Sequence, residues 1–141
     1  MDLNRFYELF TEGWSHIEFE VLEQEDEYIA FSCELNAEDY FENSIYVRVR
    51  AYDTGSLHVF LTFDEINATE RAKNLVNDFN ENNPWFNAYI TSGENQFLEL
   101  HFSNICADDE EHCADELNFA LGQLLEENTL QYLKPLLGLT Y

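Results

Sequence analysis

Hydrophobic and polar residues follow two different periods along this chain, and each change of period marks an expected element. The apolar positions of residues 2–12 recur at i, i+3, i+4 and i+7, which predicts a short helix that ends at Gly13. The period then changes to two, as in a strand with one buried face. This alternation predicts four strands, at 17–21, 29–35, 45–51 and 57–63.

In the second half of the chain the pattern predicts a helix from about Asn67, strands at 88–91 and 97–102, and a long helix after 108–111. The run 108–111 is entirely acidic, and carboxylates stabilise the positive end of a helix dipole. The long helix is expected to bend at Asn128–Thr129, before a final apolar segment at 130–139.

The order of elements is helix, four strands, helix, two strands, helix. Successive hairpins predict an antiparallel sheet of about five or six strands with the helices on one face, which is the α+β class. At 141 residues, the chain is expected to form a single domain over 1–141. The polar connection 36–43 leaves the pairing between the two first hairpins open.

The charge of the chain changes the expectation about partners. Asp and Glu number 29 against six Lys and Arg, a formal net charge of −23, while 45 % of the residues are hydrophobic. That apolar content indicates a folded domain and not a disordered acidic tail. An acidic surface repels nucleic acid and anionic membranes and favours a partner with a basic surface.

The cysteines and the N-terminus suggest a compartment. Cys33, Cys106 and Cys113 are odd in number and widely spaced, so no disulfide is expected. Neither a signal peptide nor a window of about 20 apolar residues is visible. The sequence therefore predicts a reduced, cytoplasmic protein that does not enter a membrane.

A family resemblance is carried by residues 69–125. A helix at 70–80 is followed by the segment 83–90, a strand at 97–100 and a long acidic helix. This order resembles the YbjN family, described as bacterial sensory-transduction regulators, whose fold is shared with class I type III secretion chaperones. The resemblance implies a chaperone-like fold and a homodimer that holds another protein, and it carries over no catalytic residue and no cofactor.

Catalytic and metal-binding patterns are weak in this sequence. No nucleophile elbow, phosphate loop or dinucleotide fingerprint is present. His101, Cys106, His112 and Cys113 are metal-ligand types, but their spacing is not that of zinc sites, and the acidic run 108–111 lacks the pattern of a calcium loop. The prediction is a non-enzyme without metal or cofactor.

Two aromatic-rich stretches are candidates for contact with a partner. Arg48 and Arg50 share one face of the third strand between two tyrosines, and they are expected either to anchor a partner or to pair with Glu18 and Glu20. Trp14, Trp85 and Phe86 lie beside turns and are candidates for partial exposure. The candidate partner-binding residues are Tyr46, Arg48, Arg50, Tyr52, Trp85 and Phe86.

Three functions remain open at this point. The first is a non-catalytic adaptor, chaperone-like or regulatory protein that binds a basic partner, with self-association through the sheet or the apolar segment 130–139. The second is an acidic nucleic-acid mimic that inhibits a DNA-binding protein or nuclease. The third is a small enzyme or ligand-binding protein with an unrecognised pocket.

Overall fold

A computed structural model describes residues 1–106 and 109–140 of the chain. Four helices and six strands are formed in these ranges. In chain order they are α1 Leu3–Glu12, β1 Glu20–Gln24, β2 Tyr28–Leu35, β3 Ile45–Tyr52, β4 Ser56–Glu65, α2 Glu70–Asn82, β5 Asn87–Ile90, β6 Phe97–Ile105, α3 Glu110–Gln123 and α4 Glu127–Leu137.

The six strands form one sheet in the order β1-β2-β3-β4-β6-β5, and every neighbouring pair is antiparallel. The predicted α+β class with an antiparallel sheet is confirmed, with six strands. The β1–β2 hairpin and the β3–β4 hairpin lie side by side in the sheet. Their inner strands β2 and β3 pair along the whole length of β2, from Tyr28 opposite Tyr52 to Leu35 opposite Ile45. The polar connection between them is a loop at the end of the sheet.

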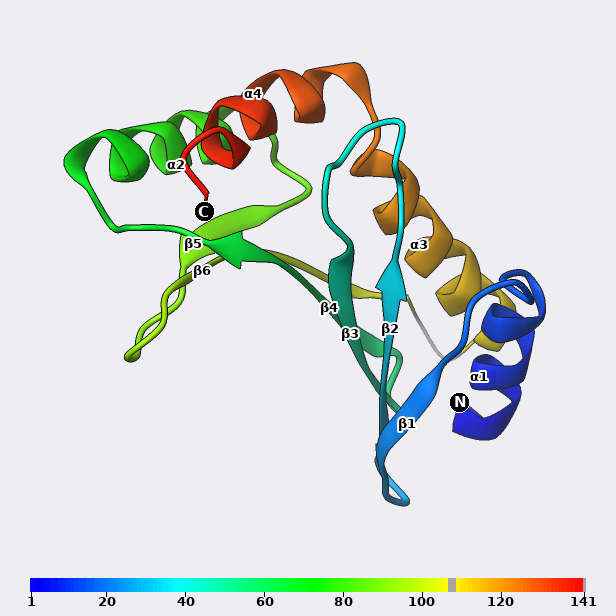
Figure 1. Cartoon of the computed structure of the whole chain (residues 1–141). Helices are drawn as coiled ribbons and strands as arrows, with labels where there is room; N and C mark the ends of the chain where they lie inside the picture. Colours follow the sequence, from blue (N-terminus) through cyan, green and yellow to red (C-terminus); the bar gives the residue numbers. More distant parts are fainter. Residues whose placement is uncertain (107–108, 141) are drawn as a thin grey trace.

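The helices lie on one face of the sheet, which we call the inner face. Figure 1 shows α1 and α3 beside the β1–β4 part of the twisted sheet, and α2 and α4 over β5 and β6. The alternate residues Val47 of β3, Val59 of β4 and Leu100 of β6 are at most 1 % exposed on this face. Burial of these apolar side chains beneath the helices is the main stabilising contribution that the fold shows.

The first strand begins later than the alternation predicts. Ile17 and Phe19 are half-buried and pack against the core, but the strand starts only at Glu20. All five residues of β1 are exposed, because this strand is the edge of the sheet. The predicted strand at 17–21 is therefore displaced toward the C-terminus.

The expected long C-terminal helix is two helices. The chain leaves α3 at Gln123 and re-enters a helix at Glu127, so the break precedes the bend expected at Asn128–Thr129. Thr129 is buried within α4, and Asn128 donates a hydrogen bond from Nδ2 to the carbonyl oxygen of Asn82, 2.9 Å away. The expected helix start also includes Asp108, which lies outside the described residues.

The apolar segment at the end of the chain belongs to the core. Leu130 is 9 % exposed, and Leu133 and Leu136 are 0 % exposed, because α4 packs against α2. The expectation that this apolar set forms a self-association surface is therefore wrong for these residues. Sequence periodicity cannot distinguish a helix that is buried within its own chain from one that is buried against a second copy.

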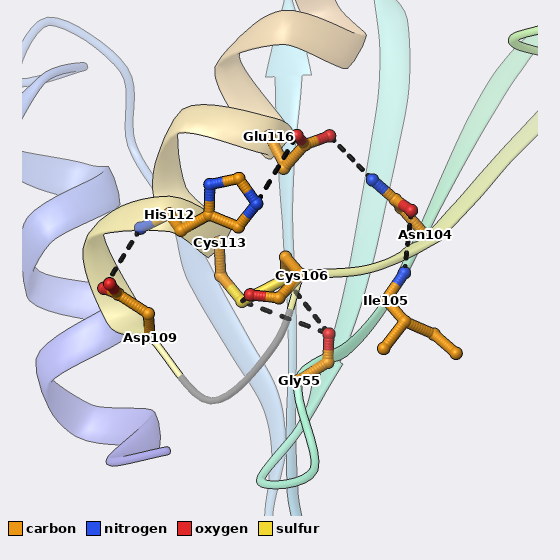
Figure 2. A network of polar contacts seen from close by, with 8 residues as sticks. All are labelled: Gly55, Asn104, Ile105, Cys106, Asp109, His112, Cys113 and Glu116. Carbon is orange, nitrogen blue, oxygen red and sulfur yellow. Dashed lines mark hydrogen bonds and ion pairs between the residues drawn. A yellow bond between two sulfur atoms is a disulfide. The ribbon is translucent and has the colours of Figure 1, made fainter.

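Two of the three cysteines form a disulfide, contrary to the sequence prediction. Cys106, directly after β6, is bonded to Cys113 in the first turns of α3, seven residues further along. Figure 2 shows both sulfur atoms beside the carbonyl oxygen of Gly55, which accepts a 3.0 Å hydrogen bond from the backbone N–H of Cys106. The end of β6 lies beside the first turns of α3, so the two Cα atoms are 5.2 Å apart, a proximity that the spacing in sequence does not reveal.

Polar contacts surround this junction (Figure 2). Asn104 donates from Nδ2 to Glu116 at 2.8 Å, and His112 lies 3.7 Å from the other oxygen of the same carboxylate. Asp109 caps α3 by accepting from the backbone N–H groups of Glu111 and His112. Cys106, Cys113 and His112 are thus all engaged in structural contacts.

Candidate functional site on the open face of the sheet

The second face of the sheet, which we call the outer face, carries no helix among the described residues (Figure 1). It is formed by the strand positions that alternate with the core. Cross-strand register places Arg48 of β3 beside Phe60 of β4, and Phe60 beside His101 of β6. The neighbouring row places Arg50 beside His58. Basic and aromatic side chains therefore form adjacent rows on an uncovered surface.

Arg48 is held by a buried carboxylate. Its guanidinium lies 5.1 Å from the centre of the Phe60 ring and donates to Oε1 of Glu99 at 2.6 Å. Glu99 is 5 % exposed and also accepts from the hydroxyl of Tyr89 at 3.0 Å. Burial, followed by the hydrogen bond to Glu99, raises the pKa of Tyr89 to about 12, so that this hydroxyl remains a donor at neutral pH.

Arg50 lies in a more open setting. Its guanidinium is 4.8 Å from the centre of the Tyr28 ring and 3.7 Å from the carboxylate of Glu23 on the edge strand. Ala30 of β2 lies between Glu23 and Arg50 in the cross-strand register, so the contact between these two side chains passes over a small residue. The Arg50 and Glu23 side chains are 42 % and 52 % exposed, so the ion pair is a surface pair of low energy.

Two histidines meet at the centre of the face. Nδ1 of His58 lies 3.1 Å from Nε2 of His101, and the two rings are within 7° of parallel. Burial and the neighbouring His58 lower the pKa of His101, since a second positive charge here would be opposed by both effects. His101 also stacks on Phe60 at 4.6 Å, which joins the histidine pair to the Arg48 cluster.

The outer face brings together four of the six predicted partner-binding residues. Arg48 and Arg50 do not pair with Glu18 and Glu20 as the alternative supposed, because their carboxylate partners are Glu99 and Glu23. The histidines and Glu99 were missed, since nothing in the local sequence shows that β6 lies beside β4. Tyr46, Arg48, Arg50 and Tyr52 all lie on this face.

The other two predicted residues lie elsewhere. Trp85 is 52 % exposed and contacts the ring of Phe119 on α3 at 5.1 Å. Phe86 is only 5 % exposed and packs against Phe102 in the core, so its expected exposure is wrong. Trp85 lies in the turn between α2 and β5 and Phe86 directly precedes β5, and the two adjacent aromatic residues end in opposite environments.

The described residues of this face place a serine hydroxyl beside a histidine. Ser56 Oγ lies 3.4 Å from Nε2 of His58, which is at the long limit for a hydrogen bond, so we assign it no nucleophilic role. Among the described residues, no three His, Cys, Asp or Glu side chains are grouped to hold a metal ion. Of the metal-ligand types noted in the sequence, Cys106 and Cys113 are joined to each other.

Comparisons of the chain with protein-family models, with curated proteins and with solved structures gave no match. The resemblance to the YbjN family and to the chaperone-like fold stays a prediction. Within the described ranges, no helix is long and apolar enough to cross a membrane.

Proposed function

We propose that the chain is a non-catalytic adaptor or regulatory protein that binds a basic partner protein through the outer face of its sheet. The observation that carries the proposal is the composition of this uncovered face. Tyr46 is 39 % exposed, and the side chains of Arg48 and Arg50 are 41 % and 42 % exposed. Tyr and Arg are enriched among the residues that dominate binding energy at protein interfaces.

The charges at two length scales support a basic partner. At long range the net charge of −23 attracts positive surfaces and accelerates their approach. At short range Arg48 and Arg50 are each paired with a carboxylate, which offsets their charge toward a basic partner, and Tyr46 contributes exposed aromatic area. Binding should therefore depend on salt in its association rate and on the aromatic side chains in its dissociation rate.

The test uses a double variant of the outer face, Arg50→Ala with Tyr52→Ala, and a matched control, Arg71→Ala with Tyr40→Ala. Both pairs remove one arginine and one tyrosine. The control residues are exposed, on α2 and on the loop after β2. Proteins captured from the native host by the wild type are identified, and the most basic of them is purified and titrated against all three chains.

The proposal expects the outer-face variant to weaken binding by about tenfold or more and the control to bind like the wild type. Equal affinities for all three chains contradict it. The mimic alternative predicts another result, in which charge reversal at Glu18 or Glu20 abolishes binding while the outer-face variant binds normally.

Self-association and location remain separate proposals. Homodimers in which two outer faces meet would bring two bodies of charge −23 together, so light scattering should show them only when salt screens the repulsion. A cytoplasmic location was predicted from the sequence, but the Cys106–Cys113 disulfide is a feature more typical of oxidising compartments. Trapping of thiols in intact native cells, followed by mass spectrometry, distinguishes the two locations.

A further inference from the structure

A second site is formed where β2 extends beyond its edge neighbour. β1 pairs with β2 only as far as Glu20 opposite Ser32, so the last three residues of β2 have no neighbour from that strand. The segment before β1, the loop after β2 and the end of α3 surround the place beside these three residues that β1 does not reach. They enclose a pocket of about 670 Å³, within the range of small-molecule sites.

The interior of the pocket is apolar. Phe19 and Leu35 are half-buried and Leu125 is 37 % exposed, so these three side chains offer apolar area to the pocket. Leu121 of α3 and Leu124, which directly follows α3, also line it but are at most 5 % exposed. Cys33 is the free cysteine and also lines the pocket. Burial raises the pKa of its thiol to about 11, so at neutral pH it is an uncharged, apolar part of the wall.

The rim of the pocket is acidic. Glu18, Glu20 and Glu34 line it and are exposed, while none of its lining residues is Lys or Arg. Glu20 is the cross-strand partner of Ser32, and Glu34 lies two residues further along β2, so both carboxylates are on the outer side of the sheet. An apolar interior with a one-signed rim selects for shape and charge together.

We propose that this pocket binds a small amphiphilic organic cation, with its apolar body against Phe19, Leu35 and Leu125 and its cationic head at the glutamates of the rim. A neutral apolar molecule would leave the three carboxylates unused. An amphiphilic anion would place like charges together, which is repulsive. The pocket shares Tyr46 with the partner-binding face, but the proposal does not rest on partner binding.

The experiment uses a fluorescent side chain that already lines the pocket. Trp14 is half-buried there, and its indole Nε1 donates to Asn118 at 2.6 Å. The second tryptophan, Trp85, is replaced by Phe to remove its signal. The probes are hexylamine, octylamine and decylamine, with octanol and octanoate as neutral and anionic analogues.

The proposal expects a saturable change of Trp14 fluorescence with the amines. Each added methylene should tighten binding about fourfold, because it is buried in the apolar interior. Octylamine should bind about tenfold more tightly than octanol, and octanoate more weakly than either. Saturating octylamine should also slow the labelling of Cys33 by a small thiol reagent, which gives a readout that is independent of fluorescence.

A pair of matched variants tests the role of the rim. Glu20→Gln with Glu34→Gln should remove most of the preference for octylamine over octanol. Glu25→Gln with Glu27→Gln changes the net charge equally in the exposed turn between β1 and β2, and should leave the preference intact. Three results would overturn the proposal. They are an equal loss of the preference for octylamine in both double variants, octanol binding as tightly as octylamine to the wild type, and Cys33 labelling that octylamine does not slow. The Arg50 and Tyr52 double variant should retain amine binding, so failure at one site does not imply failure at the other.

Discussion

Replacing Arg48 by Ala should cost much more stability than replacing Arg50 by Ala, although both residues lie on the same face of β3. Arg48 is the charged partner of Glu99, whose side chain is only 6 % exposed, at 2.6 Å. Arg50 faces a carboxylate that is 52 % exposed, at 3.7 Å. The difference in burial of the two carboxylates is the physical basis of the prediction.

The magnitudes follow from the contacts. A hydrogen bond between charged groups contributes about 1.5–3 kcal/mol, and the partial exposure of Arg48 places its contact with Glu99 at the lower end. Adding the contact with the Phe60 ring gives about 2 kcal/mol for Arg48→Ala. The exposed pair of Arg50 with Glu23 gives at most about 1 kcal/mol. For a chain of 141 residues these costs correspond to a lowering of Tm by about 7 °C and at most about 3 °C.

Urea unfolding of the wild type and both variants measures the two costs. A double-mutant cycle of Arg48→Ala with Glu99→Gln should give a coupling energy of about 1–2 kcal/mol. Sodium chloride at about 1 M should remove the cost of Arg50→Ala and reduce that of Arg48→Ala only slightly, because a buried carboxylate is screened less. Equal costs for the two variants, or no coupling between Arg48 and Glu99, would refute this reasoning.

Three further predictions concern titration and thiol chemistry. Because the pKa of His101 is lowered in the folded state, the unfolded chain binds the proton at a higher pH than the folded chain does. The free energy of unfolding should therefore fall as pH decreases below about 6.5. His101→Gln should flatten this pH dependence, measured by urea unfolding. Reduction of the Cys106–Cys113 disulfide should cost about 2 kcal/mol for so short a loop, and alkylation of the denatured chain should add one label before reduction and three after it. Cys33 in the folded protein should react with iodoacetamide at pH 8 at least about 100-fold more slowly than a free cysteine, because its pKa of about 11 leaves little thiolate; a rate equal to that of the denatured chain would contradict its burial.

The fold class follows from local patterns of hydrophobic periodicity and helix capping that can be read from the sequence. Strands such as β3 bury alternate residues, and the inner and outer faces are separated by the period of two alone. Helix α1 is specified by one apolar stripe and by Asp2, which accepts a hydrogen bond from the backbone N–H of Arg5. Such patterns determine which side of an element is buried, and they do so without knowledge of its neighbours.

The partners of those elements were decided by tertiary structure. Arg48 and Glu99 meet because β6 lies beside β4, a pairing between segments that no local period connects. Cys106 and Cys113 meet because the end of β6 lies beside the first turns of α3. The pocket exists because β1 is shorter than β2, so the end of the longer strand lies beside a space that loops and α3 enclose. Each of these features depends on contacts between distant segments, whereas hydrophobic periodicity reports only the face that each segment buries.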